Sequence, residues 1–323
     1  MSKKLWIGLA AVAIVAVVAV NLIKNGATKP IAHVLPVVKI GYRAQDLYAP
    51  LFVGMEKGYF KKQGFNVEPV KFESTNDLTS ALLAGQVDAS LGGVNTFLLL
   101  NIEQKSPGAL KLFGTAEETK HKPSSFLIVK KNGPITSLES LKGKKIGAGP
   151  GSTMQMIYRI MMTQNNITTS TLVQMDQKLE LPALAAGQID AAIVLEPLAT
   201  IGAEKNITRN LESGLFDAYI LPNLPVAASV VTIKFVTAHP DVVQKLMVAT
   251  DEAVDFIQHN PDELKTILTK FTPVELELAK KIITPPFQKS TEINVERLQQ
   301  LTDKLLVEKE LRGRVEVAGM VLK

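Results

Sequence analysis

The sequence predicts an α/β protein with two lobes, each a mostly parallel sheet flanked by helices. The chain of 323 residues is too long for one ordinary core and suits two domains of roughly 150 residues each. Strand-like and helix-like segments alternate along most of the chain, which is typical of parallel sheets covered by helices. A helix–turn–strand segment also occurs twice, which indicates two units of similar topology.

The repeated segment reads ALLAGQVDA at residues 81–89 and ALAAGQIDA at residues 183–191. Seven of the nine positions are identical, at an offset of 102 residues. In each copy a helix is expected to end at a glycine, Gly85 or Gly187, before a strand begins. We expect Asp88 and Asp190 to fix the turns before these strands rather than to contact a ligand. Independent recurrence of a common helix–turn–strand solution is the alternative, and it predicts the same local fold.

The first 29 residues differ from the rest and are typical of a signal peptide or membrane anchor. Lys3 and Lys4 precede an uncharged apolar run from Leu5 to Ile23, which is near the length that spans a bilayer. No clean cleavage site follows, which favours an uncleaved anchor; a buried helix of the fold is the alternative. Residues 30–36 are expected to form a linker. The segment predicts export to the periplasm or cell surface.

The composition excludes several kinds of site. The chain has no cysteine, which rules out disulfides, cysteine-based zinc sites, a thiol nucleophile and a lipid-modified cysteine. The four histidines lack the spacing of metal ligands, so we expect neither a metal nor a cofactor. Lysines of the N-terminal segment account for most of the net charge of +5. No nucleic-acid-binding surface is therefore expected.

The first half of the chain follows a βαβαβ order. Pro50 suits the first turn of a helix and Gly58 its end, and Ser74 with Asp77 resembles a capping box. The expected strands span 37–41, 67–72 and 87–91, and the expected helices span 50–57 and 74–85.

The pattern then restarts. Thr136 and Glu139 can cap a short helix that ends before Gly143. The expected strands span 126–129, 145–148, 172–175, 189–195 and 226–235, with helices from about 154 and over 181–186. After residue 241 the chain is predicted to be almost wholly helical, with breaks at Pro261 and Pro273.

Open α/β sheets bind ligands beyond the carboxyl ends of their strands, and this rule selects the candidate ligand-binding residues. In the first half they are Tyr42, Arg43, Asp46, Tyr48, Ser74, Thr75, Asn76, Gly92, Gly93 and Asn95. In the second half they are Gly149, Pro150, Gly151, Ser152, Thr153 and Glu196. No nucleophile–base pair stands out among them, so no catalytic residue is predicted.

The segment from Gly149 to Thr153 is the clearest candidate for anion binding. Free N–H groups at a helix start, two glycines and two hydroxyls suit a carboxylate, sulfonate or phosphate. The segment lacks the Gly-Lys-Ser/Thr of a phosphate-binding P-loop. The alternative is a glycine-rich turn in which Ser152 or Thr153 caps its helix.

The other candidates each have a structural alternative. Arg43 can bind a ligand anion through two hydrogen bonds, or pair with Asp46 to order the loop. Tyr42 and Tyr48 can form an aromatic wall, or pack at the edge of the lobe. Glu196 and Asn95 can bind a ligand through hydrogen bonds, or act as a hinge contact or helix cap.

Several segments together resemble the solute-binding proteins of ABC transporters for nitrate, sulfonates, taurine and thiamine-pyrimidine precursors. The resemblance covers roughly residues 37–311 and depends on the order and spacing of motifs that are weak individually. These are Gly41-Tyr42, residues 49–53 and 56–68, both copies of the repeat, residues 140–147, Glu196-Pro197, and residues 239–243 with 260–263.

The resemblance implies a type II periplasmic-binding-protein fold, in which two crossing strands form a hinge and the ligand lies between the lobes. Residues 37–122 and 226–323 would form lobe 1, and residues 123–225 lobe 2. It implies a monomer that captures a small, anionic solute for an ABC transporter permease. An enzyme of the same fold, of the thiamine-pyrimidine or menaquinone-pathway type, is one alternative, although the synthase's cysteine-rich motif is impossible here. A membrane-tethered sensor is the other.

Overall fold

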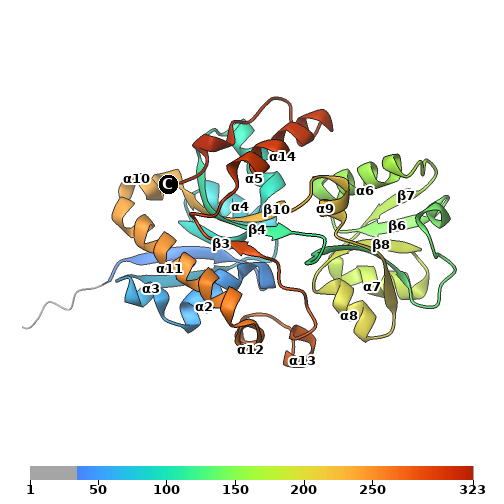
Figure 1. The fold of residues 1–323 in the computed structure, drawn as a ribbon, viewed down its shortest axis with the longest axis horizontal. Helices are drawn as coiled ribbons and strands as arrows, with labels where there is room; N and C mark the ends of the chain where they lie inside the picture. The colour runs from blue at the N-terminus through green and yellow to red at the C-terminus, as the bar shows by residue number, and fades with distance from the viewer. Residues whose placement is uncertain (1–34, 323) are drawn as a thin grey trace, which may run out of the picture. The chain divides into compact units, whose positions relative to one another are not determined.

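The computed structural model describes residues 35–322, which fold around two mixed β-sheets flanked by helices (Figure 1). The α/β fold class predicted from the sequence is confirmed. The predicted export segment at residues 1–29, and most of the linker, lie outside the described residues. No helix within residues 35–322 combines the length and the apolar character needed to cross a bilayer.

The first sheet has six strands in the order β11-β4-β10-β3-β1-β2. β1 pairs in parallel with β2 and β3, whereas β10 pairs antiparallel with β3 and β4, and β11 pairs antiparallel with β4. The strands are β1 (Val37–Tyr42), β2 (Asn66–Lys71), β3 (Ala89–Asn95), β4 (Leu110–Glu118), β10 (Leu224–Thr232) and β11 (Phe287–Gln288).

The second sheet has five strands in the order β7-β6-β8-β5-β9. β6 pairs in parallel with β7 and β8, and β5 pairs antiparallel with β8 and β9. The strands are β5 (Ser125–Lys130), β6 (Lys145–Ala148), β7 (Thr171–Gln174), β8 (Ala191–Leu195) and β9 (Thr208–Ser213).

Helices connect and cover the strands of both sheets (Figure 1). Those of the first half of the chain are η1 (Asp46–Tyr48), α2 (Ala49–Glu56), α3 (Tyr59–Lys62), α4 (Thr75–Leu83), α5 (Thr96–Lys105), η2 (Leu138–Leu141) and α6 (Ser152–Gln164). Those of the second half are α7 (Gln177–Ala186), α8 (Leu198–Glu204), α9 (Leu215–Tyr219), α10 (Ile233–Ala238), α11 (Pro240–His259), α12 (Pro261–Phe271), α13 (Leu276–Ala279), α14 (Val295–Val307) and η3 (Val317–Gly319).

The two copies of the repeat occupy equivalent places in the two sheets, as the sequence predicts. Gly85 follows α4 and Gly187 follows α7, with φ of +69° and +76°, a backbone conformation that favours glycine. Asp88 accepts a hydrogen bond at 2.8 Å from the N–H of Lys39 in β1. Asp190 accepts the same bond at 2.9 Å from the N–H of Lys145 in β6. Both aspartates therefore fix the turns before their strands.

Glu118 joins the two segments through which the chain passes between the sheets. It is fully buried at the end of β4, and its carboxylate accepts hydrogen bonds from Ser124 and Ser125 at the start of β5. It also accepts bonds from the N–H groups of Phe216 and Asp217 in α9, which precedes β10. These five charge-assisted bonds hold the outgoing and returning segments together.

Three local predictions need correction. The third strand spans Ala89–Asn95 rather than residues 87–91, since Asp88 still belongs to the turn that its side chain fixes. The predicted strand 226–235 ends at Thr232, whose side chain caps α10 by accepting from the N–H of Phe235. The short helix before Gly143 is a 3-10 helix that follows Ser137, so Thr136 is not its cap.

Candidate functional site

A cleft of about 470 Å³ lies where the carboxyl ends of strands from both sheets meet. The segments that follow β1 and β2, and the end of β3 with the start of α5, form its wall on the first sheet. The segments that follow β6 and β7, and the end of β8, form its wall on the second. This is the position that the strand-end rule favours for a ligand. The lining residues are Arg43, Glu73, Ser74, Thr75, Asn76, Asn95, Leu98, Gly149, Pro150, Gly151, Ser152, Thr153, Met154, Asp176, Gln177, Lys178 and Leu195.

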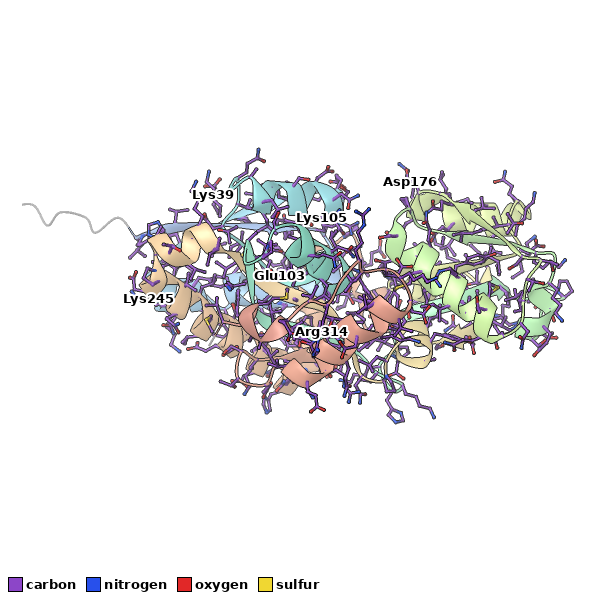
Figure 2. The ribbon with its side chains drawn as sticks, turned by 90° about the horizontal axis from the view of Figure 1, so that it is seen from above. Lys39, Glu103, Lys105, Asp176, Lys245 and Arg314 are labelled. Carbon is purple, nitrogen blue, oxygen red and sulfur yellow. The ribbon has the colours of Figure 1, made fainter. Side chains whose placement is uncertain are left out.

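Most of the residues selected from the sequence line this cleft. Arg43, Ser74, Thr75, Asn76 and Asn95 do so from the first sheet, and Gly151, Ser152 and Thr153 from the second. Figure 2 shows Asp176, another lining residue, at the surface of the part built on the second sheet. The remaining candidates lie elsewhere: Tyr42, Tyr48 and Gly93 in or against the core, and Asp46 and Glu196 around a smaller adjoining cavity.

Arg43 is held by the loop that follows β2. Its Nη1 donates a hydrogen bond to Thr75 Oγ1 at 3.1 Å, and the residue is half-buried. Among the described residues no ion pair joins Arg43 to Asp46, so the expected loop-ordering pair does not form. The guanidinium group keeps further donors for a ligand, because one arginine offers five N–H groups.

The N-terminus of α6 presents backbone N–H groups to the cleft. Gly151 precedes the helix with φ of +125°, which only glycine adopts readily. No side chain caps this helix end, so the capping role considered for Ser152 and Thr153 is not observed. Uncapped N–H groups and the helix dipole together favour an anion at this position.

Two polar residues of the cleft also cap helices. Asn95 Oδ1 accepts from the N–H of Leu98 at 3.0 Å and caps α5. Ser74 Oγ accepts from the N–H of Asp77 at 3.1 Å and donates to its carboxylate at 2.7 Å, at the start of α4. The capping interaction predicted for Ser74 is therefore present.

Neither Tyr42 nor Tyr48 lines the cleft, and both pack in or against the core, which agrees with the packing alternative rather than with an aromatic wall. Tyr48 is fully buried and donates to the carbonyl oxygen of Gly93 at 3.2 Å. A methyl group on Gly93 would lie 2.1 Å from the Tyr48 ring, so the ring fills the space that the absent side chain leaves. Tyr42 packs edge-to-face on Phe52, with centroids 5.6 Å apart. Burial raises the pKa of the Tyr48 hydroxyl.

A smaller cavity of about 60 Å³ adjoins the cleft and is lined by Asp46 and Glu196. Burial and the neighbouring Glu196 raise the pKa of Asp46 to about 7. Burial also raises the pKa of Glu196, although Glu196 accepts a hydrogen bond from Thr200 Oγ1 at 2.8 Å. This contact with α8 agrees with the structural alternative for Glu196.

Lys265 lies near both acids and was not found from the sequence. It is almost fully buried in α12, and its Nζ donates to the carbonyl oxygen of Ile282 at 2.7 Å. Burial lowers the pKa of Lys265, while Asp46 and Glu196 act to raise it. The lysine in turn favours the ionised form of each acid. No signal in the sequence separates Lys265 from Lys270, the exposed lysine of the same helix.

Glu180 in α7 lies behind the cleft wall and was also missed. It is 1% exposed, and neither carboxyl oxygen has a hydrogen-bond partner among the described residues. Its Oε1 lies 3.7 Å from the point where a methyl group on Gly149 would sit. Burial raises the pKa of Glu180 to about 8. The repeat contained a signal for Glu180, since at the offset of 102 residues the acid stands at the position equivalent to the core residue Leu78.

Within residues 35–322, no group of three or more acidic or histidine side chains is arranged to hold a metal ion.

The chain matches a family model described as "NMT1/THI5 like" over residues 46–264. It is 25% identical over 246 residues to a binding protein of Brucella abortus strain 2308, covering 74% of this chain and 72% of that protein. It is 23% identical over 273 residues to a Bacillus subtilis strain 168 protein described as binding aliphatic sulfonates, covering 82% and 79%. It is 27% identical over 234 residues to the 4-amino-5-hydroxymethyl-2-methylpyrimidine phosphate synthase of Aspergillus parasiticus, covering 68% and 66%.

Solved structures share the fold at low sequence identity. The alkanesulfonate-binding protein SsuA of Xanthomonas axonopodis pv. citri, bound to MOPS, superposes with a TM-score of 0.69 at 18% identity, covering 88% of this chain and 98% of that one. The periplasmic nitrate-binding protein NrtA of Synechocystis PCC 6803 gives a TM-score of 0.67 at 15% identity, covering 89% and 85%. These matches confirm the periplasmic-binding-protein fold that the sequence motifs implied.

Proposed function

Because the chain belongs to the NMT1/THI5-like family, we propose that it is the extracytoplasmic solute-binding component of an ABC importer. Its solute is small and anionic, of the nitrate or sulfonate class, and is bound in the cleft between the two sheets. The observation that carries this proposal is the uncapped N-terminus of α6, which lines the same cavity as Arg43.

The two walls offer complementary recognition of an anion. Arg43 supplies charge-assisted hydrogen bonds from the first sheet. The N–H groups of residues 151–153 supply neutral donors and a helix dipole from the second. An anion that touches both walls stabilises the arrangement in which they are close together. The ligand thereby shifts the population towards a closed state, and a permease recognises that state.

The cysteine-free chain disfavours the synthase alternative that the fungal relative raises. A cysteine-rich motif of the kind found in that enzyme family cannot exist here, since the chain contains no cysteine. The N-terminal lysines and apolar run further support an exported protein rather than a cytosolic biosynthetic enzyme. A C-terminal fusion to a reporter that is active only after export should give signal, and an inactive reporter would contradict this location.

Binding measurements on one arginine test the proposal. We expect calorimetry to detect binding of nitrate, methanesulfonate or taurine to the wild-type protein. Arg43→Ala should weaken that binding by roughly 1.5–3 kcal/mol, the scale of a hydrogen bond to a charged group. Its stability without ligand should change little, since a single half-exposed bond contributes about 1 kcal/mol or less.

Lys178 provides a matched control for general positive potential. It lines the same cleft, but its ammonium group lies 3.4 Å from Asp176 and the side chain is 78% exposed. Lys178→Ala should therefore change affinity much less than Arg43→Ala. A wild-type protein that binds neither nitrate nor the two sulfonates, and instead binds an amine that lacks an acidic group, would contradict the assignment of an anionic group and direct attention to Asp46 and Glu196.

A further inference from the structure

Glu180 occupies a place where a charged side chain is costly. It is 1% exposed, and the repeat places the leucine Leu78 at the equivalent position beside β1. Leu78 is fully buried in the core. A buried carboxyl group without a hydrogen-bond partner destabilises the fold, and an ionised one does so much more. The second half of the molecule therefore keeps a polar group where the first half has an apolar one.

This carboxyl group lies directly behind the anion-binding segment. Glu180 Oε1 and Gln177 Nε2 lie 3.7 Å and 3.8 Å from the point where a methyl group on Gly149 would sit. Both Gly149 and Gln177 line the cleft, so Glu180 lies next to two residues that a ligand in the cleft can contact. At a separation of several ångströms through the protein interior, a negative charge on Glu180 repels an anion, because the effective dielectric constant there is lower than that of water.

We propose that anion capture at the N-terminus of α6 is coupled to protonation of Glu180, an inference that rests on the proposed function. The cleft binds an anion while Glu180 is in its uncharged acid form, and affinity falls as Glu180 ionises. The solute class follows from this coupling: it is an anion that keeps its charge in the pH range where Glu180 holds its proton, as strong oxyanions do.

No nearby base neutralises Glu180 within the described part of the chain. α7 packs against β5, β6, β8 and α8. The charged residues of these elements lie apart from it or are already paired. Lys130 is beside Gly187 at the opposite end of α7, and Lys145 is exposed at the start of β6. Two further charged residues are already paired: Glu204 with Lys281, and Lys178 of α7 with Asp176. Burial alone accounts for the raised pKa of Glu180, which is about 8.

The sign of the coupling follows from electrostatics. A bound anion favours the protonated form of Glu180, so its pKa rises further when the anion binds. Near pH 8, where part of the free protein has lost this proton, binding therefore takes up a fraction of a proton. At higher pH the anion binds about tenfold more weakly or worse, the effect of two like charges several ångströms apart at an effective dielectric constant of about 20.

Proton uptake is measured by calorimetry in two buffers that differ in ionisation enthalpy. The probes are nitrate and methanesulfonate, which stay ionised from about pH 6 to pH 9.5, so only the protein titrates. We expect wild-type protein to take up a proton fraction near pH 8 and to lose about tenfold in affinity between about pH 6.5 and pH 9.5. Glu180→Gln should lack this share of the proton uptake and retain its affinity at high pH.

Two further variants make the comparison specific. Glu139→Gln alters an exposed acid of the same half, outside the cleft, and should behave as wild type. Glu180→Leu introduces the residue found at the equivalent position 78 and serves if the glutamine variant fails to fold. Asp46, whose pKa is about 7, also lines the adjoining cavity and titrates in all these proteins. The test therefore compares the proton uptake and the affinity of each Glu180 variant with those of wild-type protein.

The outcomes separate this inference from the proposed function. Binding of either probe with equal proton uptake in wild-type protein and the Glu180 variants would overturn the coupling and leave the proposed function standing. Failure of both probes to bind wild-type protein at any pH would overturn the anion assignment, and the coupling with it.

Discussion

The two halves of the molecule share a framework but present different chemistry to the cleft. In both, a nearly identical helix–turn–strand unit has an aspartate just before its strand, and this aspartate accepts a hydrogen bond from the N–H of a lysine in the neighbouring strand, Lys39 or Lys145. Two residues beyond each lysine is a glycine, Gly41 or Gly147, where an added methyl group would collide with a packed side chain. The framework therefore repeats residue by residue up to the ends of β1 and β6.

Beyond these glycines the halves diverge. Four residues after Lys39 comes Arg43, and four residues after Lys145 comes Gly149. In the proposed function, the first half would therefore recognise a ligand through a charged side chain, and the second through backbone N–H groups that a glycine leaves accessible. Beneath the two loops the chain has Leu78 and Glu180 at matching positions. A common scaffold fixes the strand ends, and single substitutions at those ends determine what each wall can bind.

The largest expected effect concerns the position at which the halves differ. With a pKa raised from 4.5 to about 8, Glu180 keeps its proton in the folded state while the unfolded state loses it. Its contribution to stability is therefore present below about pH 4.5 and is lost as the pH rises to about 8, at up to about 1.4 kcal/mol per pH unit. Glu180→Leu should remove this loss, so that urea unfolding shows a gain of roughly 2–3 kcal/mol over wild type at pH 7.5 relative to pH 5.5. If wild-type protein and Glu180→Leu instead lose stability in parallel as the pH rises, Glu180 does not have a raised pKa in the folded protein.

The next effect tests whether the frameworks are equivalent. A methyl group on Gly41 would lie 2.3 Å from Leu78 Cδ1, and one on Gly147 would lie 2.4 Å from Ile189 Cδ1. Gly41→Ala and Gly147→Ala should each destabilise the protein by about 1–3 kcal/mol, the usual cost of overpacking. Gly319→Ala is the control, since nothing lies within 4 Å of its added methyl group. A large loss at only one of the two strand positions would contradict the equivalence.

The smallest effect concerns the repeated aspartates. Asp88→Ala and Asp190→Ala each remove one charge-assisted bond to a backbone N–H, at 2.8 Å and 2.9 Å. Because both side chains are partly exposed, we expect a loss of about 1–2 kcal/mol in each case. Asp190 also lies 3.8 Å from Lys144 Nζ, and such a partly exposed ion pair contributes about 0–1 kcal/mol. The loss at Asp190, measured by chemical unfolding, should therefore equal or slightly exceed the loss at Asp88. A larger loss at Asp88 would show that it has a further partner or role.

Local sequence patterns determined much of the scaffold. The repeat alone determined that Gly85 and Gly187 end helices and that Asp88 and Asp190 fix the following turns, because these features depend on residues close together in the chain. The strand-end rule selected Arg43 and the segment 149–153, since parallel strands carry their carboxyl ends to the same edge of each sheet; that the two edges line one cleft is a feature of the tertiary structure. The family motifs likewise predicted the fold that the solved structures share.

The tertiary structure alone decided which polar groups are buried. Tyr48 belongs to the core because Gly93, 45 residues away, leaves room for its ring. Lys265 lies near Asp46 and Glu196 because α12 lines a cavity together with the segments that follow β1 and β8. Glu180 lacks a partner because no donor from another element reaches it within the described residues. Desolvation and charge pairing depend on contacts between distant segments, and no local pattern in the sequence records them.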